Sequence, residues 1–226
     1  MNQRRTEYLF SDAICGFFEV PTDCIRPLLN SRVQPLEPHH GTSLLAVSAF
    51  DFTGSEVGSY GEITFSVVVA PWFRPGYRLP KAALFPFQVA TTTTASREHA
   101  IERWHLPHWM NDVSMEWERH DGVTTARASH QGRPIVELTV TQHSWSPAIV
   151  PFQMYSSDTK GTYFADMEFD GVHCEHEDER GNVVLHKHPL LRDWDFDDVT
   201  PTPSREFWMR NGVQSFEPLV TLHAGG

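Results

Sequence analysis

Runs of apolar and β-branched residues dominate the chain and alternate with short polar turns. Two such runs, 43–52 and 61–70, are joined by the Gly/Ser-rich loop TGSEVGSY. A third run, 85–94, ends in four consecutive threonines, and β-branched residues favour an extended backbone. The pattern therefore predicts three successive strands in the first half of the chain.

A second group of runs is separated by turn dipeptides. The segments 113–120 and 123–130 flank Asp121-Gly122, a strong hairpin signal, and 133–143 follows Gln131-Gly132. This spacing predicts a three-stranded meander. Further strand patterns follow at the positions 150–157, 161–176 and 181–188, and 206–222 supplies the last strand or two.

Helical signals are few and short. We expect a short helix within 22–30, a longer one within 95–104 that starts near Ser96 and stops before Pro107, and one or two turns at 188–194. A chain with this many strands must protect its sheet edges. The sequence therefore predicts one mainly β domain over residues 1–226, with a closed or strongly curved sheet.

Charge and cysteine content exclude several function classes. The formal net charge is −11 and no basic patch is evident, so we expect neither nucleic acid nor an anionic membrane as a partner. Three cysteines without regular spacing argue against a disulfide framework. No apolar run has the length of a membrane span or a signal peptide, and the expected location is cytoplasmic.

The thirteen histidines raise the question of a metal site. The stretch 173–188 is rich in potential ligands, and His186 and His188 alternate on a predicted strand, so they share one face. No pair has a known zinc spacing. We therefore expect no metal and no cofactor, and a metal-dependent lyase that uses this histidine-rich half is kept as an alternative.

Three segments resemble the acetoacetate decarboxylase superfamily. Residues 49–69 contain Gly58-Ser-Tyr60-Gly-Glu62 before a strand, which is similar to that family's G-x-Y-x-E segment. Residues 100–109, AIERWHLPHW, resemble its G-R-E-x-x-x-Y-P-K-K segment, and 20–38 resembles its strand, short helix and exit. The resemblance implies a closed or cone-like antiparallel β-barrel with a few short helices, a deep apolar pocket and an oligomer of identical chains.

The same alignment implies that most of the family's catalytic groups are absent. The Schiff-base lysine falls on His108, its lysine neighbour on Trp109, the active-site arginine on or near Pro21, and a strand carboxylate on or near Val47. The glutamate of the family's G-x-Y-x-E segment is retained and falls on Glu62. An imidazole cannot form the iminium that a primary amine forms with a ketone, so Schiff-base decarboxylation is not expected.

The remaining groups predict acid/base chemistry on a small enolisable carbonyl compound. We expect Glu62 and His108 to be catalytic and to face one pocket, because both side-chain types transfer protons near neutral pH when suitably placed. Isomerisation, dehydration, cyclisation and decarboxylation without a Schiff base all remain open, so the enzyme class is lyase or isomerase. A binding module without turnover is the second hypothesis. The expected substrate-binding residues are Tyr60, Glu102, Trp104, His105 and Trp109.

Overall fold

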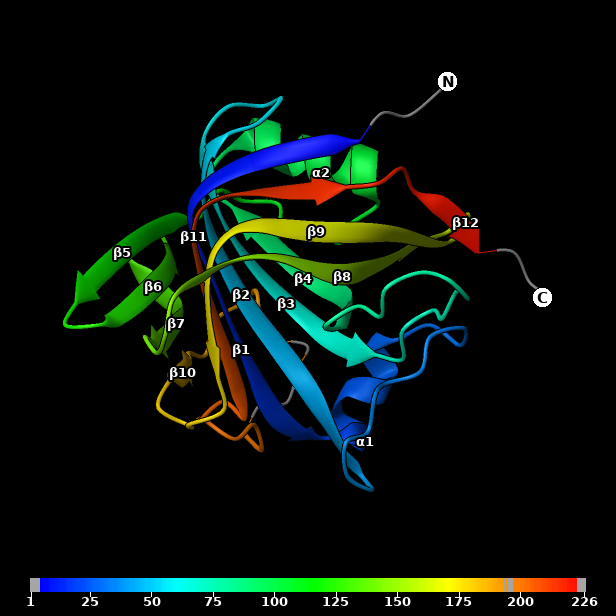
Figure 1. Cartoon of the computed structure of the whole chain (residues 1–226), viewed down its shortest axis with the longest axis horizontal. Coiled ribbons are helices and arrows are strands. Elements are labelled where there is room, and N and C mark those ends of the chain that lie inside the picture. The colour runs from blue at the N-terminus through cyan, green and yellow to red at the C-terminus, as the bar shows by residue number, and fades with distance from the viewer. Residues whose placement is uncertain (1–4, 193, 195–196, 223–226) are drawn as a thin grey trace.

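The computed structural model describes residues 5–192, 194 and 197–222, and its centre is a closed β-barrel (Figure 1). Seven strands follow one another in the order β11-β1-β2-β3-β4-β8-β9, and pairing of β9 with β11 closes the ring. Their bounds are Thr6–Pro21 (β1), Thr42–Gly54 (β2), Tyr60–Val69 (β3), Ala83–Thr91 (β4), Ser146–Asp158 (β8), Gly161–His176 (β9) and Arg205–Phe216 (β11). The short β12, Val220–Leu222, pairs with β9.

The expected barrel is confirmed, with one departure from the antiparallel pattern. β4 and β8 are parallel neighbours through Ala83 and Leu84, whereas the other pairings in the ring are antiparallel. A parallel pair requires a long connection. Here the connection contains a helix and the whole three-stranded meander.

The three-stranded meander and the later strand β10 form a second, four-stranded sheet beside the barrel (Figure 1). Its strand order is β10-β7-β6-β5, with bounds Asn182–Leu185, Arg133–Thr141, Val123–His130 and Ser114–His120. The predicted hairpin turn at Asp121-Gly122 is confirmed, because both residues have positive φ values of 48° and 76°. Positive φ at both central positions is the requirement of the tight hairpin turn that this dipeptide favours.

The helices are few, as expected, and the start of the longest one needs correction. α1 (Thr22–Ile25) continues into a short 3₁₀ turn, η1 (Arg26–Leu28). α2 (Thr94–Trp104) starts earlier than predicted, because the Thr93 side chain accepts a hydrogen bond from the Ser96 amide and caps the helix. The described part of 188–194 contains hydrogen-bonded turns, as expected, and residue 193 lies outside the described residues.

α2 is the longest helix in the described chain, with 11 residues. No helix in this part of the protein combines the length and the apolar character needed to cross a bilayer.

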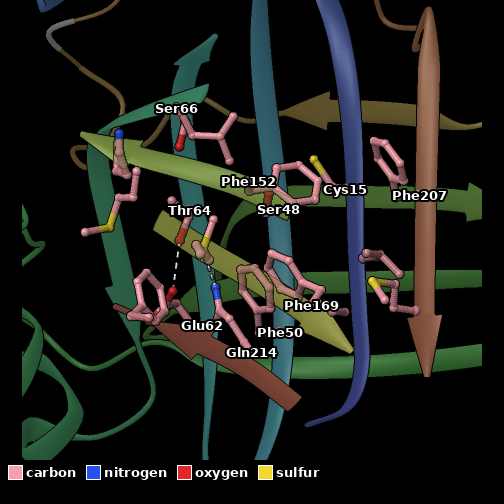
Figure 2. A pocket seen from close by; sticks show the side chains of 18 of the residues that line it. Cys15, Ser48, Phe50, Glu62, Thr64, Ser66, Phe152, Phe169, Phe207 and Gln214 are labelled. Carbon is pink, nitrogen blue, oxygen red and sulfur yellow. Dashed lines mark hydrogen bonds between the residues drawn. The ribbon is translucent and has the colours of Figure 1, made fainter. Parts of the chain in front are cut away.

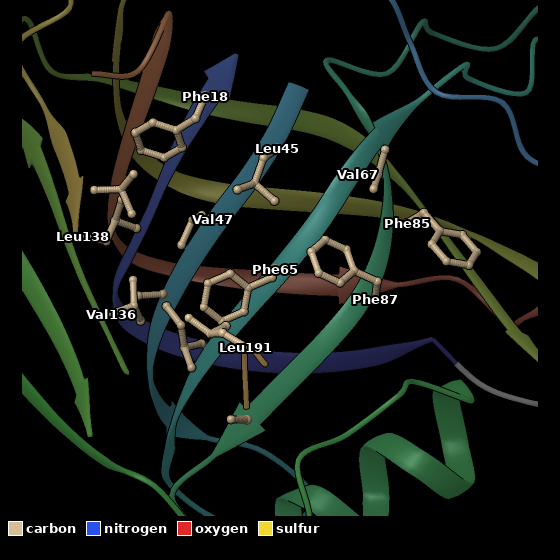
Figure 3. Packing of buried hydrophobic residues seen from close by; sticks show 14 of the residues in the cluster. Phe18, Leu45, Val47, Phe65, Val67, Phe85, Phe87, Val136, Leu138 and Leu191 are labelled. Atoms are coloured by element: carbon tan, nitrogen blue, oxygen red, sulfur yellow. The ribbon is translucent and has the colours of Figure 1, made fainter. Parts of the chain in front are cut away.

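The long barrel strands are buried on both faces, which explains their nearly continuous apolar sequence. On β2, for example, Leu45 and Val47 face an outer core, whereas Ala46 belongs to the inner core of the barrel. The outer core fills the space between β1–β4 and the second sheet, where Val136 and Leu138 pack against it (Figure 3). Because successive side chains of a strand point to opposite faces, each of these strands contributes to both cores.

A bulge in β11 sets which side chains enter the barrel. The pairing of β11 with β9 shifts register between Arg210 and Val213, and Asn211 has a positive φ of 49°. Before the shift the odd-numbered Phe207 and Met209 face inward, and after it the even-numbered residues do so. One extra residue reverses the alternation of side chains, as expected of a β-bulge.

Replacing Gly212 by alanine should destabilise the protein, because the new methyl group would collide with the Asp170 carbonyl oxygen and the Phe10 ring. We expect a loss of about 1–3 kcal/mol in the free energy of unfolding, measured by urea denaturation. Gly54→Ala is the matched control, since its nearest neighbour is the flexible Leu9 side chain at 3.2 Å. Equal stability of the two variants would contradict the role of the bulge.

Candidate functional site

The barrel encloses a cavity between its inner strand faces (Figure 2). The volume of this cavity is about 80 Å³. Every strand of the closed ring contributes to the wall. The lining residues are Ala13, Ile14, Cys15, Ser48, Phe50, Glu62, Thr64, Ser66, Leu84, Pro86, Leu106, Phe152, Met154, Met167, Phe169, Phe207, Met209, Gln214 and Phe216.

Most of this wall is apolar, with Phe and Met side chains from β8, β9 and β11. A row of polar side chains crosses it on β3, where Glu62, Thr64 and Ser66 are two residues apart and therefore share one face. None of the lining residues is a lysine, arginine or histidine. Such a site is typical of a small-molecule pocket, with a few polar groups in an apolar surface.

Glu62 is the carboxyl group of the cavity. Its strand lies between β2 and β4, with Phe50 and Thr91 as cross-strand neighbours, so both sides of its backbone are covered. The Thr64 hydroxyl donates a hydrogen bond of 3.1 Å to Glu62 Oε1. Burial raises the pKa of Glu62 from 4.5 to about 7, and the Thr64 hydrogen bond opposes that shift only in part. At neutral pH the group can therefore both accept and donate a proton.

Gln214 enters the cavity from β11 after the bulge. Its Nε2 donates to the Met167 sulfur at 3.0 Å, and a thioether is a weak acceptor. Sequence reasoning did not single out this residue. The Asn211-Gly212 dipeptide, typical of a tight turn or bulge, was the available signal.

Cys15 does not provide a nucleophile in this setting. Burial raises the pKa of its thiol to about 12, against the opposing effect of a hydrogen bond with Ser48. The thiolate is the reactive form of cysteine. The Cys15 side chain therefore stays a neutral thiol at neutral pH and acts as part of the wall.

His108 is not among the residues that line the cavity. It forms a parallel bridge with Val89, and its Nδ1 lies 2.8 Å from the Trp109 carbonyl oxygen. Burial lowers the pKa of His108, which keeps the ring neutral, and its buried Nε2 has no hydrogen-bond partner in the described chain. The expected meeting of Glu62 and His108 at one cavity is not found, and a catalytic role for His108 stays a prediction.

Two of the expected substrate-binding residues lie in the inner core near the cavity. Tyr60 packs against Phe52, with ring centroids 4.9 Å apart. The Trp104 indole donates a hydrogen bond of 2.6 Å to the Tyr8 hydroxyl and packs against Phe216, which is itself part of the wall. Neither lines the cavity, and Trp104 supports the wall from behind through Phe216.

The other three expected substrate-binding residues face elsewhere. Glu102 is exposed on α2. His105 ends that helix, lies 3.1 Å from an Asp158 carboxylate oxygen and stacks on Tyr163. Trp109 packs against the outer core. From the same sequence segment only Leu106 lines the cavity.

The histidine-rich half of the chain does not gather its ligands. Within the described residues there is no group of three or more His, Cys, Asp and Glu side chains placed to hold a metal ion. His176 instead contacts Thr141 and the buried Glu206, and His186 lies 3.2 Å from Glu137. The metal-dependent alternative therefore has no supporting geometry in this part of the chain.

Comparison with known proteins gives matches to solved structures alone. No family model matches the chain, and no curated protein matches it by sequence. An acetoacetate decarboxylase from Legionella pneumophila aligns with a TM-score of 0.67 at 13% identity, over 98% of this chain and 88% of that one. The enduracididine biosynthesis enzyme MppR, complexed with pyruvate, aligns at 0.64 and 11% identity, over 99% and 92% of the two chains.

An acetoacetate decarboxylase-like enzyme from Sphingomonas wittichii RW1 aligns at 0.60 and 12% identity, over 99% and 94% of the chains. Alignment over nearly the whole length establishes that this chain has the acetoacetate decarboxylase-like fold. Function resides in the site and is not fixed by the fold.

The raised pKa of Glu62 predicts a pH-dependent stability. An unfolded glutamate ionises near pH 4.5, whereas folded Glu62 keeps its proton up to about pH 7. Stability should therefore fall as the pH rises from 4.5 to 7, by about 3 kcal/mol, and level off above 7. Glu62→Gln should remove this fall, and the exposed Glu102→Gln should keep it. Urea denaturation between pH 5 and 8 measures the difference, and parallel curves for wild type and Glu62→Gln would refute the shift.

Proposed function

We propose that this protein is an acid/base enzyme of the acetoacetate decarboxylase superfamily that isomerises a small enolisable carbonyl compound. The observation that carries the proposal is Glu62, a carboxyl group with a pKa near 7 in the largely apolar cavity of the barrel. A catalytic acid or base is most effective when its pKa is close to the working pH. Burial raises the pKa of Glu62 to about 7, so this carboxyl group meets that condition at neutral pH.

The chemistry requires no co-reactant. Ionised Glu62 removes a proton from the carbon next to the carbonyl, and the C–H electron pair moves into the C–C bond while the carbonyl electrons move to oxygen. The protonated Glu62 then returns the proton to the opposite face of the α-carbon, which inverts a stereocentre, or to the γ-carbon of an unsaturated substrate, which shifts its C=C bond. Either step restores the carbonyl and the carboxylate. One carboxyl group completes this cycle, and Glu62 is the only acidic side chain among the lining residues. Isomerisation therefore fits this site better than dehydration, which uses separate groups for proton removal and departure of water.

The lysines do not support a Schiff base. Lys81 binds Glu175 at 2.7 Å, and Lys160 and Lys187 are exposed. None lines the cavity. A nucleophilic lysine needs burial or a neighbouring cation to lower the pKa of its amine. We infer that the enzyme works without a covalent intermediate.

A binding protein without turnover is the second candidate. The observation in its favour is that His108 does not reach the cavity and leaves Glu62 without a partner base. Such a protein would hold the same carbonyl compound and leave its C–H bonds intact. Exchange of substrate hydrogen with solvent separates the two candidates.

Association of identical chains, cytoplasmic location and the absence of nucleic acid and membrane partners also stay predictions. The loop between β3 and β4 presents Trp72, Phe73, Tyr77 and Leu79 to solvent, with 40–65% of each side chain exposed. Exposed apolar clusters often mark protein contacts, and this one would suit a second copy of the chain.

Deuterium uptake tests the activity. A panel of small ketones is incubated with the protein in D₂O, and loss of the α-proton signal is followed by NMR. Glu62→Gln should reduce the rate by about a hundredfold to ten-thousandfold. In wild type the rate should rise with pH through about 7 and then level off, because the carboxylate is the base.

Glu102→Gln serves as the control and should exchange at the wild-type rate, because its carboxylate lies on the exposed face of α2. Undiminished exchange by Glu62→Gln would sink the proposal. A loss in His108→Ala as large as that in Glu62→Gln would instead restore His108 as the partner base.

A further inference from the structure

We propose that the cavity accepts an uncharged carbonyl compound, with its oxygen held by the Gln214 amide, and rejects carboxylates. This inference deepens the proposed function, on which it rests for the carbonyl group. It also implies that the reaction is not a decarboxylation, since the substrate of a decarboxylase is an acid that is ionised at neutral pH.

The charged side chains around the cavity disfavour an anionic ligand. Within the described part of the chain, no cationic side chain lines the cavity. Two basic side chains approach the wall at Phe207. The His173 ring stacks on it at 5.4 Å, and burial lowers the pKa of His173 and keeps that ring neutral at pH 7. The Lys81 ammonium lies 5.8 Å from the Phe207 ring and is bound by Glu175 at 2.7 Å. Arg74 lies in a surface groove that shares Phe152 and Met167 with the cavity wall, and it is paired with Asp166. A buried anion would therefore find no counter-ion.

The free-energy cost of removing a ligand from water decides which ligand the cavity can bind. A carboxylate that enters an apolar cavity loses its hydration, and that loss is recovered only through a cation or several hydrogen bonds. The cavity already holds Glu62, whose ionisation burial disfavours. A second carboxylate would add like-charge repulsion to desolvation. A neutral carbonyl compound needs one good hydrogen-bond donor, and it loses much less hydration free energy than a carboxylate when it enters the cavity.

Gln214 supplies that donor. Its side chain and that of Glu62 both line the cavity, on β11 and β3 respectively (Figure 2). The amide is buried, and its Nε2 donates a hydrogen bond to the Met167 sulfur. A thioether sulfur is a weak acceptor, so a carbonyl oxygen is the better partner for this donor. The same donor would stabilise the negative charge that develops on the oxygen when Glu62 removes the α-proton.

The size of the cavity limits the substrate. A volume of about 80 Å³ suits a small molecule. The Phe and Met walls favour an apolar skeleton. A small ketone or diketone meets both conditions.

The test compares two probes of equal heavy-atom count on the wild-type protein. 2,4-Pentanedione is neutral, and acetoacetate carries a carboxylate oxygen in place of one methyl group. We expect the diketone to bind about a hundredfold more tightly at pH 7, measured by isothermal titration calorimetry. We also expect no release of carbon dioxide from acetoacetate.

Gln214→Leu tests the donor, with the exposed Gln142→Leu as the matched control. Loss of one hydrogen bond should weaken diketone binding about tenfold in Gln214→Leu and leave it unchanged in the control. Thermal unfolding checks that both variants fold. The comparison of the two probes on the wild type stands even if Gln214→Leu does not fold.

The possible results separate the two proposals. Binding of acetoacetate as tightly as the diketone, or binding of neither probe, would overturn the inference. Unchanged diketone affinity in a folded Gln214→Leu variant would overturn the role of Gln214. Selective binding of the diketone without deuterium exchange would leave the inference standing, while the proposed isomerase activity would fail.

Discussion

Closure of the barrel by β9 and β11 is the constraint on which the site depends. With that pairing the seven strands leave no open edge in the ring, and the inner side chains are shielded from water. Large Phe and Met side chains then fill the interior unevenly and leave a cavity. The raised pKa of Glu62 follows directly, because its main cause is burial and only a Thr64 hydroxyl opposes it.

The second sheet contributes by burying the outer face of the same strands. On β3, Phe65 packs in the outer core while its neighbours Thr64 and Ser66 face the cavity. The strand is thus anchored on one side by apolar contacts and is free to present polar groups on the other. Rigid strands position a carboxyl group more precisely than loops do. The site is therefore built on a strand that contributes side chains to both cores.

Local signals predicted most of the fold, and the site only in part. Asp121-Gly122 sets its own turn, so the hairpin could be derived from two residues. Glu62 was found through the resemblance around Tyr60. Gln214 was missed because its inward direction depends on the bulge at Asn211 and on pairing with a strand some 45 residues earlier. The direction of His108 depends in the same way on its bridge to Val89. Long-range pairing is what a single sequence conceals.

The energetic cost of Glu62 is itself an argument for function. A carboxyl group whose pKa is raised from 4.5 to about 7 destabilises the folded protein by about 3 kcal/mol at pH 8, relative to a residue that does not ionise. An apolar side chain of similar size would suit the surrounding wall better. Strongly perturbed carboxyl groups in cavities cluster at functional sites, where stability is lost in exchange for reactivity. Because none of the described residues that line the same cavity is a cation, we infer that this reactivity is directed at proton transfer to and from a neutral molecule, while the binding of an anion would meet repulsion and lost hydration.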